Sequence, residues 1–264
     1  MKNSSSFLMR SRLKLASGVA ALAFGLSVQA ASDSSWWVAV VNDQAAAVRE
    51  ELARGADPNA LDADKLPTLM LAIRSGAWQV YDALLAHRHT EIDIENQHGE
   101  TPLMYLALLG ETERAAALIK RGAKVNRLGW TPLHYAASRG QTDTGRLLIQ
   151  HGAIIHAPAP DGTTPLMMAA YSGDRDMVQL LLDNGADATA INLNKHTAAD
   201  WARERRHSAL ADELDAIARR TVAQREGRPV PPDAGRSVAP APAPAPATGN
   251  AGRYFDLNRF EDED

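Results

Sequence analysis

The stretch Thr131-Pro132-Leu133-His134 decides the fold, because the chain repeats it at a nearly fixed interval. Related stretches begin at Thr101, at Thr164 and, in a degenerate form, at Thr197, which gives spacings of 30, 33 and 33 residues. A glycine follows nine residues after each of the first three threonines, at Gly110, Gly140 and Gly173. A period near 33 residues is typical of an array of stacked helical units.

Each landmark has a local physical cause, seen most clearly in the copy that begins at Thr164. A threonine at a helix N-terminus accepts a hydrogen bond from an unpaired backbone N–H. Pro165 then occupies the first helical position, where its missing N–H costs nothing. Gly173 tolerates the positive φ that ends a helix. Apolar residues at helical spacing follow at Val178, Leu181 and Leu182, so the unit predicts two short helices joined by a tight turn.

The repeated Thr-Pro-Leu stretches, with their spacing and their helix-ending glycines, resemble the ankyrin repeat family over residues 32–220. The resemblance implies an all-α solenoid in which helix pairs stack and hairpins protrude between them. We lay out six units, at residues 32–64, 65–98, 99–128, 129–161, 162–194 and 195–220. The first helix is expected to begin at Trp36-Trp37, and the last unit turns polar, as end units that face water do.

The N-terminus resembles a secretory signal peptide over residues 1–30. Four basic residues precede an apolar run from Leu15 to Val28, which is shorter than the roughly 20 residues of a permanent span. Small residues end it at Ala30, after which we expect cleavage, and the repeat domain begins at residue 31. The alternative is an uncleaved membrane anchor. We expect a periplasmic protein, without stable membrane insertion of the mature chain.

Charge and cysteine content narrow the partners and the sources of stability. Removing residues 1–30 leaves 24 Lys and Arg against 32 Asp and Glu, a net charge of −8. That balance argues against nucleic acid and anionic membranes as partners. The chain has no cysteine, which excludes a lipoprotein anchor and disulfides. We expect a monomer that is stabilised by packing alone and binds a protein partner.

The composition changes after residue 220. Residues 221–252 are rich in Pro and Ala and are expected to form a disordered, extended linker. Residues 253–264 combine Tyr254, Phe255, Leu257 and Phe260 with a run of acids. This tail is either a docking peptide, for a partner or for the chain's own groove, or an acidic solubilising segment.

No motif in the chain indicates catalysis or a cofactor. There is no Gly-x-Ser-x-Gly, no cysteine nucleophile and no glycine-rich phosphate loop. His87 and His89 are candidate metal ligands. No further ligand follows at a recognisable spacing, so we expect no metal site. His134 occupies the place of the family's structural histidine, which implies a hydrogen bond between neighbouring units. We therefore expect a protein that is not an enzyme.

The resemblance also implies where a partner binds. In this family the two residues before the helix-ending glycine, and the residue before the threonine, face the inner groove. The hairpin before Trp130 is about three residues shorter than its neighbours, which brings this tryptophan to the middle of the array. The alternative is that Trp130 fills the void that the short hairpin leaves. The predicted binding residues are Arg74, Leu108, Leu109, Trp130, Arg139 and Tyr171.

The function expected from these features is a scaffold or adaptor that binds a protein partner through the groove and the hairpin tips. Two more specific roles stay open. By analogy with similar exported bacterial ankyrin proteins, the chain would support a periplasmic catalase or peroxidase. It would otherwise be an immunity protein that inhibits a toxin acting in the periplasm.

Overall fold

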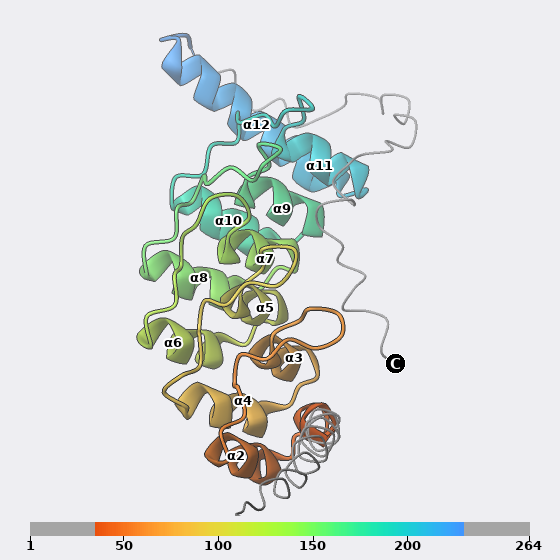
Figure 1. Ribbon diagram of the computed structural model, residues 1–264. Helices are drawn as coiled ribbons and strands as arrows, with labels where there is room; N and C mark the ends of the chain where they lie inside the picture. Colours follow the sequence, from red (N-terminus) through yellow and green to blue (C-terminus); the bar gives the residue numbers. More distant parts are fainter. Residues whose placement is uncertain (1–34, 230–264) are drawn as a thin grey trace, which may run out of the picture.

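The repeats fold as pairs of short helices in the computed structural model, which describes residues 35–229 (Figure 1). The first helices of the pairs are α3 (Thr68–Arg74), α5 (Pro102–Leu109), α7 (Pro132–Ser138), α9 (Pro165–Ser172) and α11 (Ala198–Glu204). The second helices are α4 (Trp78–Ala86), α6 (Thr112–Lys120), α8 (Thr142–Gln150), α10 (Arg175–Asp183) and α12 (Ser208–Arg225). A helix over residues 35–41 and α2 (Ala45–Ala53) form the pair at the N-terminal end.

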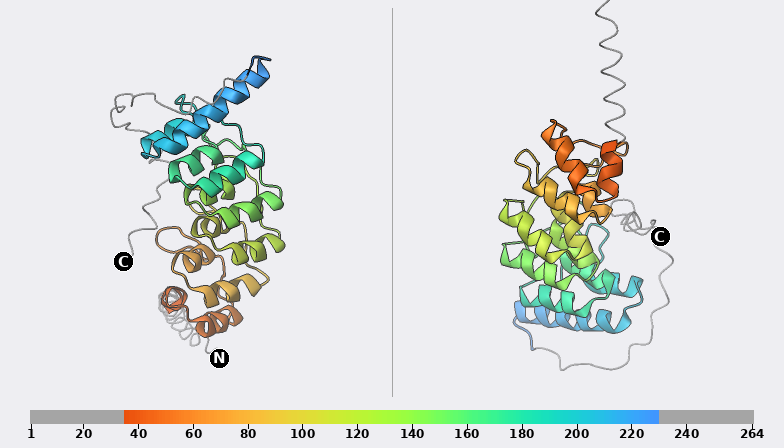
Figure 2. Two further views of the ribbon diagram at one scale, coloured as in Figure 1. Left: turned by 180° about the vertical axis from the view of Figure 1, so that it is seen from behind. Right: turned by 90° about the horizontal axis from the view of Figure 1, so that it is seen from below.

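The helix pairs stack into two columns (Figures 1 and 2). The inner column contains α3, α5, α7, α9 and α11, each in contact with the next. The outer column contains α4, α6, α8 and α10. One leucine of each central inner helix is almost fully buried, at Leu69, Leu103, Leu133 and Leu166. A helical solenoid is therefore confirmed, and its core runs the length of the stack because each unit buries its apolar face against its neighbours.

Helix ends follow the predicted capping chemistry. The hydroxyl of Thr164 accepts a hydrogen bond from the backbone N–H of Met167 at 3.4 Å, and Pro165 is the first residue of α9. Gly173 closes the same helix with a φ of 78°. In the last unit, Arg206 stands where the central units have this glycine, and it adopts a φ of 66° that is costly for a residue with a side chain.

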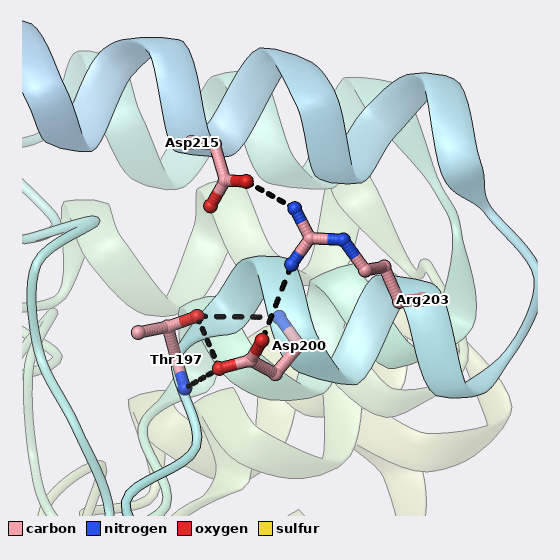
Figure 3. Close-up of polar contacts among 4 residues, drawn as sticks. All are labelled: Thr197, Asp200, Arg203 and Asp215. Carbon is pink, nitrogen blue, oxygen red and sulfur yellow. Dashed lines mark hydrogen bonds and ion pairs between the residues drawn. The ribbon is translucent and has the colours of Figure 1, made fainter. Parts of the chain in front are cut away.

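The C-terminal end is closed by α12, which lies across the end of the stack (Figure 2). Figure 3 shows the polar contacts that begin α11 and join it to α12. The Asp200 carboxylate accepts from the N–H of Thr197 at 2.9 Å, and the Asp200 N–H donates to the Thr197 hydroxyl at 3.2 Å. Arg203 bridges the two helices through ion pairs with Asp200 and with Asp215 of α12.

The last helix is longer than the sequence indicated. We placed the end of the repeats at residue 220, yet α12 continues to Arg225. Ala223 is buried, and Arg225 forms an ion pair with Asp187 at 3.0 Å, so this end of the helix is held against the preceding hairpin. Burial alone would raise the pKa of Asp187, but hydrogen bonds from Thr189 and Arg225 outweigh it and lower that pKa. The predicted signal peptide, the rest of the linker beyond Pro229 and the acidic tail lie outside the described residues.

Candidate functional site

Five side chains lie at the carboxyl ends of the inner helices: three directly precede the turn residue, and two, Arg74 and Tyr171, stand two residues before it. We call this set the inner-helix row: Arg74, Leu109, Arg139, Tyr171 and Arg205. Because α3, α5, α7, α9 and α11 contact one another in order, the row runs along five consecutive units. Leu109 keeps 40% of its surface exposed, Arg205 is exposed and the other three are half-buried. The row contains four of the six predicted binding residues.

Leu108 does not belong to this surface, and its prediction as a binding residue was wrong. The side chain is only 3% exposed and forms part of the core. Consecutive residues of an α-helix point about 100° apart, so Leu108 and Leu109 cannot both face outward at the same place. The family pattern names both positions without distinguishing them, and only the rotation of α5 in the stack decides which one is buried.

Trp130 packs against His134 and the core, and part of its surface stays exposed. Its ring lies edge-on to the ring of His134, with centroids 5.2 Å apart and planes at 76°. It is half-buried against the core, which supports the packing interpretation in part. The hairpin that carries it is held by Arg127, which pairs with Glu95 at 3.0 Å and donates to the carbonyl of Gly99. Leu128, at the tip of that hairpin, is 96% exposed.

Tyr171 and Arg205 are coupled across two units. The Arg205 guanidinium carbon lies 4.5 Å from the centroid of the Tyr171 ring, and Trp201 meets the same ring edge-on at 5.5 Å. A guanidinium over an aromatic face is an attractive pairing that leaves its N–H donors available to an anion. The sequence interpretation missed Arg205 as a binding residue. Its position could have identified it, because Arg205 directly precedes Arg206, which stands where the other units have a helix-ending glycine.

A buried carboxylate lies in the units that carry Leu109 and Trp130. Glu100 is 6% exposed and accepts hydrogen bonds from Tyr135 at 2.7 Å, Tyr105 at 3.4 Å and the Asn96 amide at 2.6 Å. The two tyrosines come from consecutive inner helices, so the cluster ties one unit to the next. Sequence reasoning placed Glu100 on the groove but did not find the cluster, because Tyr105 and Tyr135 occupy core positions of their helices.

His134 forms the expected bond between units. Its Nε2 lies 3.1 Å from the carbonyl oxygen of Thr163, so Nε2 carries the proton and donates. Its Nδ1 accepts from the backbone N–H of Thr131 at 3.2 Å. The side chain is fully buried, and this burial lowers the pKa of His134 to about 4 despite the favourable hydrogen bond to Thr163. The histidine is therefore neutral and structural at neutral pH.

A second surface feature lies at the amino ends of the outer helices. A polar depression there is lined by residues of α6, α8 and α10 and of the turns that precede them. Its polar groups bond mainly to one another: Thr112 meets Thr144 at 2.6 Å, and Asp174 accepts from the N–H of Met177 at 2.7 Å and from Thr142 at 3.3 Å. These bonds join adjacent units and cap α10, so the depression is explained by the stacking.

The described residues were also compared with the other site predictions. His87 and His89 lie with ring centroids 5.6 Å apart, and no group of three or more potential metal ligands occurs within residues 35–229. In the same range no helix has both the length and the apolar character that crossing a membrane demands.

Comparison with known proteins agrees with this geometry. The family model described as "Ankyrin repeats (3 copies)" matches residues 36–128 and again residues 124–192, which together exceed half of the chain. The chain therefore belongs to the ankyrin repeat family. Ankyrin repeats generally mediate protein–protein interaction, and the family is typically non-catalytic.

One relative illustrates how local the similarity is. The human "Transient receptor potential cation channel subfamily A member 1" is 30% identical over 86 residues. That match covers 33% of this chain but only 8% of the channel, so the chain spans a small part of the relative's length. The similarity concerns the repeats, and the channel's activity does not transfer with it.

Proposed function

We propose that this chain is a non-catalytic adaptor that binds a protein partner through the inner-helix row, after export to the periplasm. The exposure of Leu109 is the observation that carries the proposal. The residues directly before the turn in neighbouring units are Ser75, Arg139 and Ser172, all polar. The exposed part of this leucine is therefore not a feature that the repeat pattern requires, and apolar groups together with arginine are typical of binding hot spots.

The leader sequence supports the periplasmic part of the proposal. Residues 1–30 combine a basic start, a short apolar run and a small-residue end, which is the pattern of a cleaved signal. Export is tested by N-terminal sequencing of the protein purified from the cells that produce it. A chain that begins at Ala31 supports export, and a chain that retains its leader in the cytoplasm contradicts it.

Partner binding is tested by affinity capture from the same cells, with mass spectrometry of the retained proteins. The informative variant is Leu109→Glu, which places a charge on the row at a side chain that is 40% exposed. Leu128→Glu is the matched control, because it makes the same change at an exposed leucine on a hairpin tip. Both variants are first shown to be folded by circular dichroism.

The proposal expects one dominant protein to be retained by the native chain and the Leu128→Glu variant, and lost with Leu109→Glu. Loss with Leu128→Glu alone would move the binding surface to the hairpin tips. Equal retention by all three chains would contradict a role for the row. A captured catalase or peroxidase would indicate an accessory role, and a captured toxin would indicate an immunity role.

A further inference from the structure

The inner-helix row combines cationic and apolar side chains, drawn from two adjacent positions near the ends of the inner helices. Cationic side chains stand in the second, fourth and sixth units, at Arg74, Arg139 and Arg205. Leu109 and Tyr171 stand in the units between them. Within the described residues, neither Arg74 nor Arg205 forms an ion pair with a carboxylate, and Arg205 contacts the ring of Tyr171 instead. The row thus carries three cationic and two apolar side chains, and the exposed carboxylate of Glu204 directly precedes Arg205.

The C-terminal segment of the same chain has the opposite charge and matching apolar groups. Residues 253–264 carry five acids and two arginines, a net charge of −3. Four apolar side chains lie among them: Tyr254, Phe255, Leu257 and Phe260. Carboxylates pair with arginine through two parallel hydrogen bonds, and aromatic rings pack on exposed leucine and tyrosine. An acidic solubilising segment would not require these apolar residues.

The length of chain between the two elements permits docking. The described chain ends at Pro229, at the C-terminal end of the stack but on its hairpin side, because Arg225 pairs with Asp187. Arg205 lies at the opposite end of α12, whose 18 residues span roughly 27 Å that the linker must also cover. The 24 residue steps from Pro229 to Arg253 span up to roughly 74 Å in a polyproline conformation, at about 3.1 Å per residue. Packed helices lie about 8–10 Å apart, so five units extend over roughly 40 Å. Twelve residues in an extended conformation also cover roughly 40 Å.

We propose that residues 253–264 dock on the inner-helix row of their own chain and compete there with the protein partner. The competition rests on the proposed binding function of the row, whereas the docking does not. Tethering holds the segment at a millimolar effective concentration, so even a weak contact keeps the row occupied. A partner must then displace the segment, which lowers its apparent affinity.

The docking is tested with a fluorescent synthetic peptide of residues 253–264. Its anisotropy is titrated with the chain lacking residues 1–30 and with the same chain ending at residue 252, at low and at physiological salt. The shorter chain retains every described helix, because α12 ends at Arg225. We expect the shorter chain to bind the peptide at least about tenfold more tightly, because the attached segment blocks the row in the longer one.

Point variants of the shorter chain locate the contact. Leu109→Glu and Arg205→Glu are expected to weaken peptide binding at least about tenfold, since each removes a contact and adds like charge. The matched controls are Leu128→Glu and Arg146→Glu, at exposed positions on a hairpin tip and on α8, which should leave binding unchanged. A peptide with serine at residues 255 and 260 should bind more weakly than the native peptide.

Several results would overturn the proposal. These are an absence of binding at millimolar peptide, equal binding of a scrambled peptide, or equal binding by the longer and shorter chains. Light scattering that shows dimers of the longer chain only would mean that the segment docks on a second copy. If the peptide fails but Leu109→Glu still abolishes partner capture, the proposed function stands and the self-docking is rejected.

Discussion

At the scale of single residues, His134 shows how a buried polar group links two units. The neutral imidazole uses both nitrogens, one toward Thr131 in its own unit and one toward Thr163 in the next. The protonated form loses the acceptor at Nδ1 and places a charge in the core. Stability must therefore depend on pH through this residue.

The sign of that dependence follows from the two pKa values. An unfolded histidine binds a proton near pH 6.5, whereas the pKa of folded His134 is lowered to about 4. Between these values the unfolded state binds more protons, so the free energy of unfolding decreases as the pH falls from about 6.5 to about 4. The full loss is on the order of 3 kcal/mol.

Urea unfolding of the native chain and of His134→Gln at several pH values between 7 and 4 measures this contribution. At each pH, the difference in free energy of unfolding between the two chains reports the contribution of His134, because carboxylates that titrate in the same pH range affect both chains alike. His151→Gln, at an exposed position, serves as the control and should follow the native curve. A difference that stays constant with pH would show that His134 does not titrate in this window.

Arg206 gives a residue-scale prediction of the opposite sign. Its φ of 66° lies in the left-handed region, which costs a residue with a side chain roughly 1–2 kcal/mol. Arg206→Gly is therefore expected to raise the free energy of unfolding by about 1 kcal/mol, as measured by urea denaturation.

The reciprocal change, Gly140→Ala, provides the comparison. Gly140 has nearly the same φ, 65°, and an added Cβ would lie 2.7 Å from the Cβ of Asp174 in the next unit. Gly140→Ala should lower the free energy of unfolding by more than Arg206→Gly raises it, because the backbone strain and the clash between units both destabilise the fold. An Arg206→Gly chain that is less stable than the native one would indicate that the arginine side chain contributes more than its backbone costs.

At the scale of elements, α12 acts as the cap of the stack. Its residues Leu210, Ala211 and Leu214 are buried, and the ion pairs of Arg203 join it to α11. The ion pairs are partly exposed and contribute at most about 1 kcal/mol. The buried leucines contribute roughly 1.5–3 kcal/mol each, so burial rather than charge holds the cap in place.

A pair of truncations tests this assignment. A chain that ends at His207 exposes the apolar surface beneath α12 and should lose at least about 3 kcal/mol of stability, by urea unfolding followed with circular dichroism. A chain that ends at Pro229 keeps α12 and should lose only about 1.4 kcal/mol, the contribution of tenfold-favoured docking of residues 253–264. Equal midpoints for the two truncations would show that α12 does not stabilise the stack.

At the scale of the whole molecule, stability is a sum over units and the contacts between neighbours. The position of a destabilising substitution should then determine how many units lose stability. Leu133 is fully buried in a central unit, whereas Leu210 is buried in the terminal one. A Leu→Ala change in such sites costs about 2–5 kcal/mol.

Amide hydrogen exchange distinguishes the two cases. Leu133→Ala should lower protection in both halves of the array, because it weakens the unit that joins them. Leu210→Ala should lower protection in α11 and α12 and leave α5 and α7 nearly unchanged. Uniform loss of protection in both variants would contradict a nearest-neighbour stack and indicate a single cooperative unit.

The sequence by itself determined the repeat and the chemistry of its helix ends. Thr164, Pro165 and Gly173 act within one helix, so their roles depend on neighbours in the chain and can be seen in the pattern. The same holds for His134, whose place in the repeated stretch indicated its bond to the next unit.

Only the tertiary structure decided which side chains are exposed. The choice between Leu108 and Leu109 depends on the rotation of α5 in the stack, about 100° per residue, which the repeat pattern does not specify. The cluster around Glu100, the contact of Arg205 with Tyr171 and the extension of α12 to Arg225 all depend on contacts between residues 34 to 38 positions apart. These interactions arise between units, where packing in three dimensions replaces the local pattern.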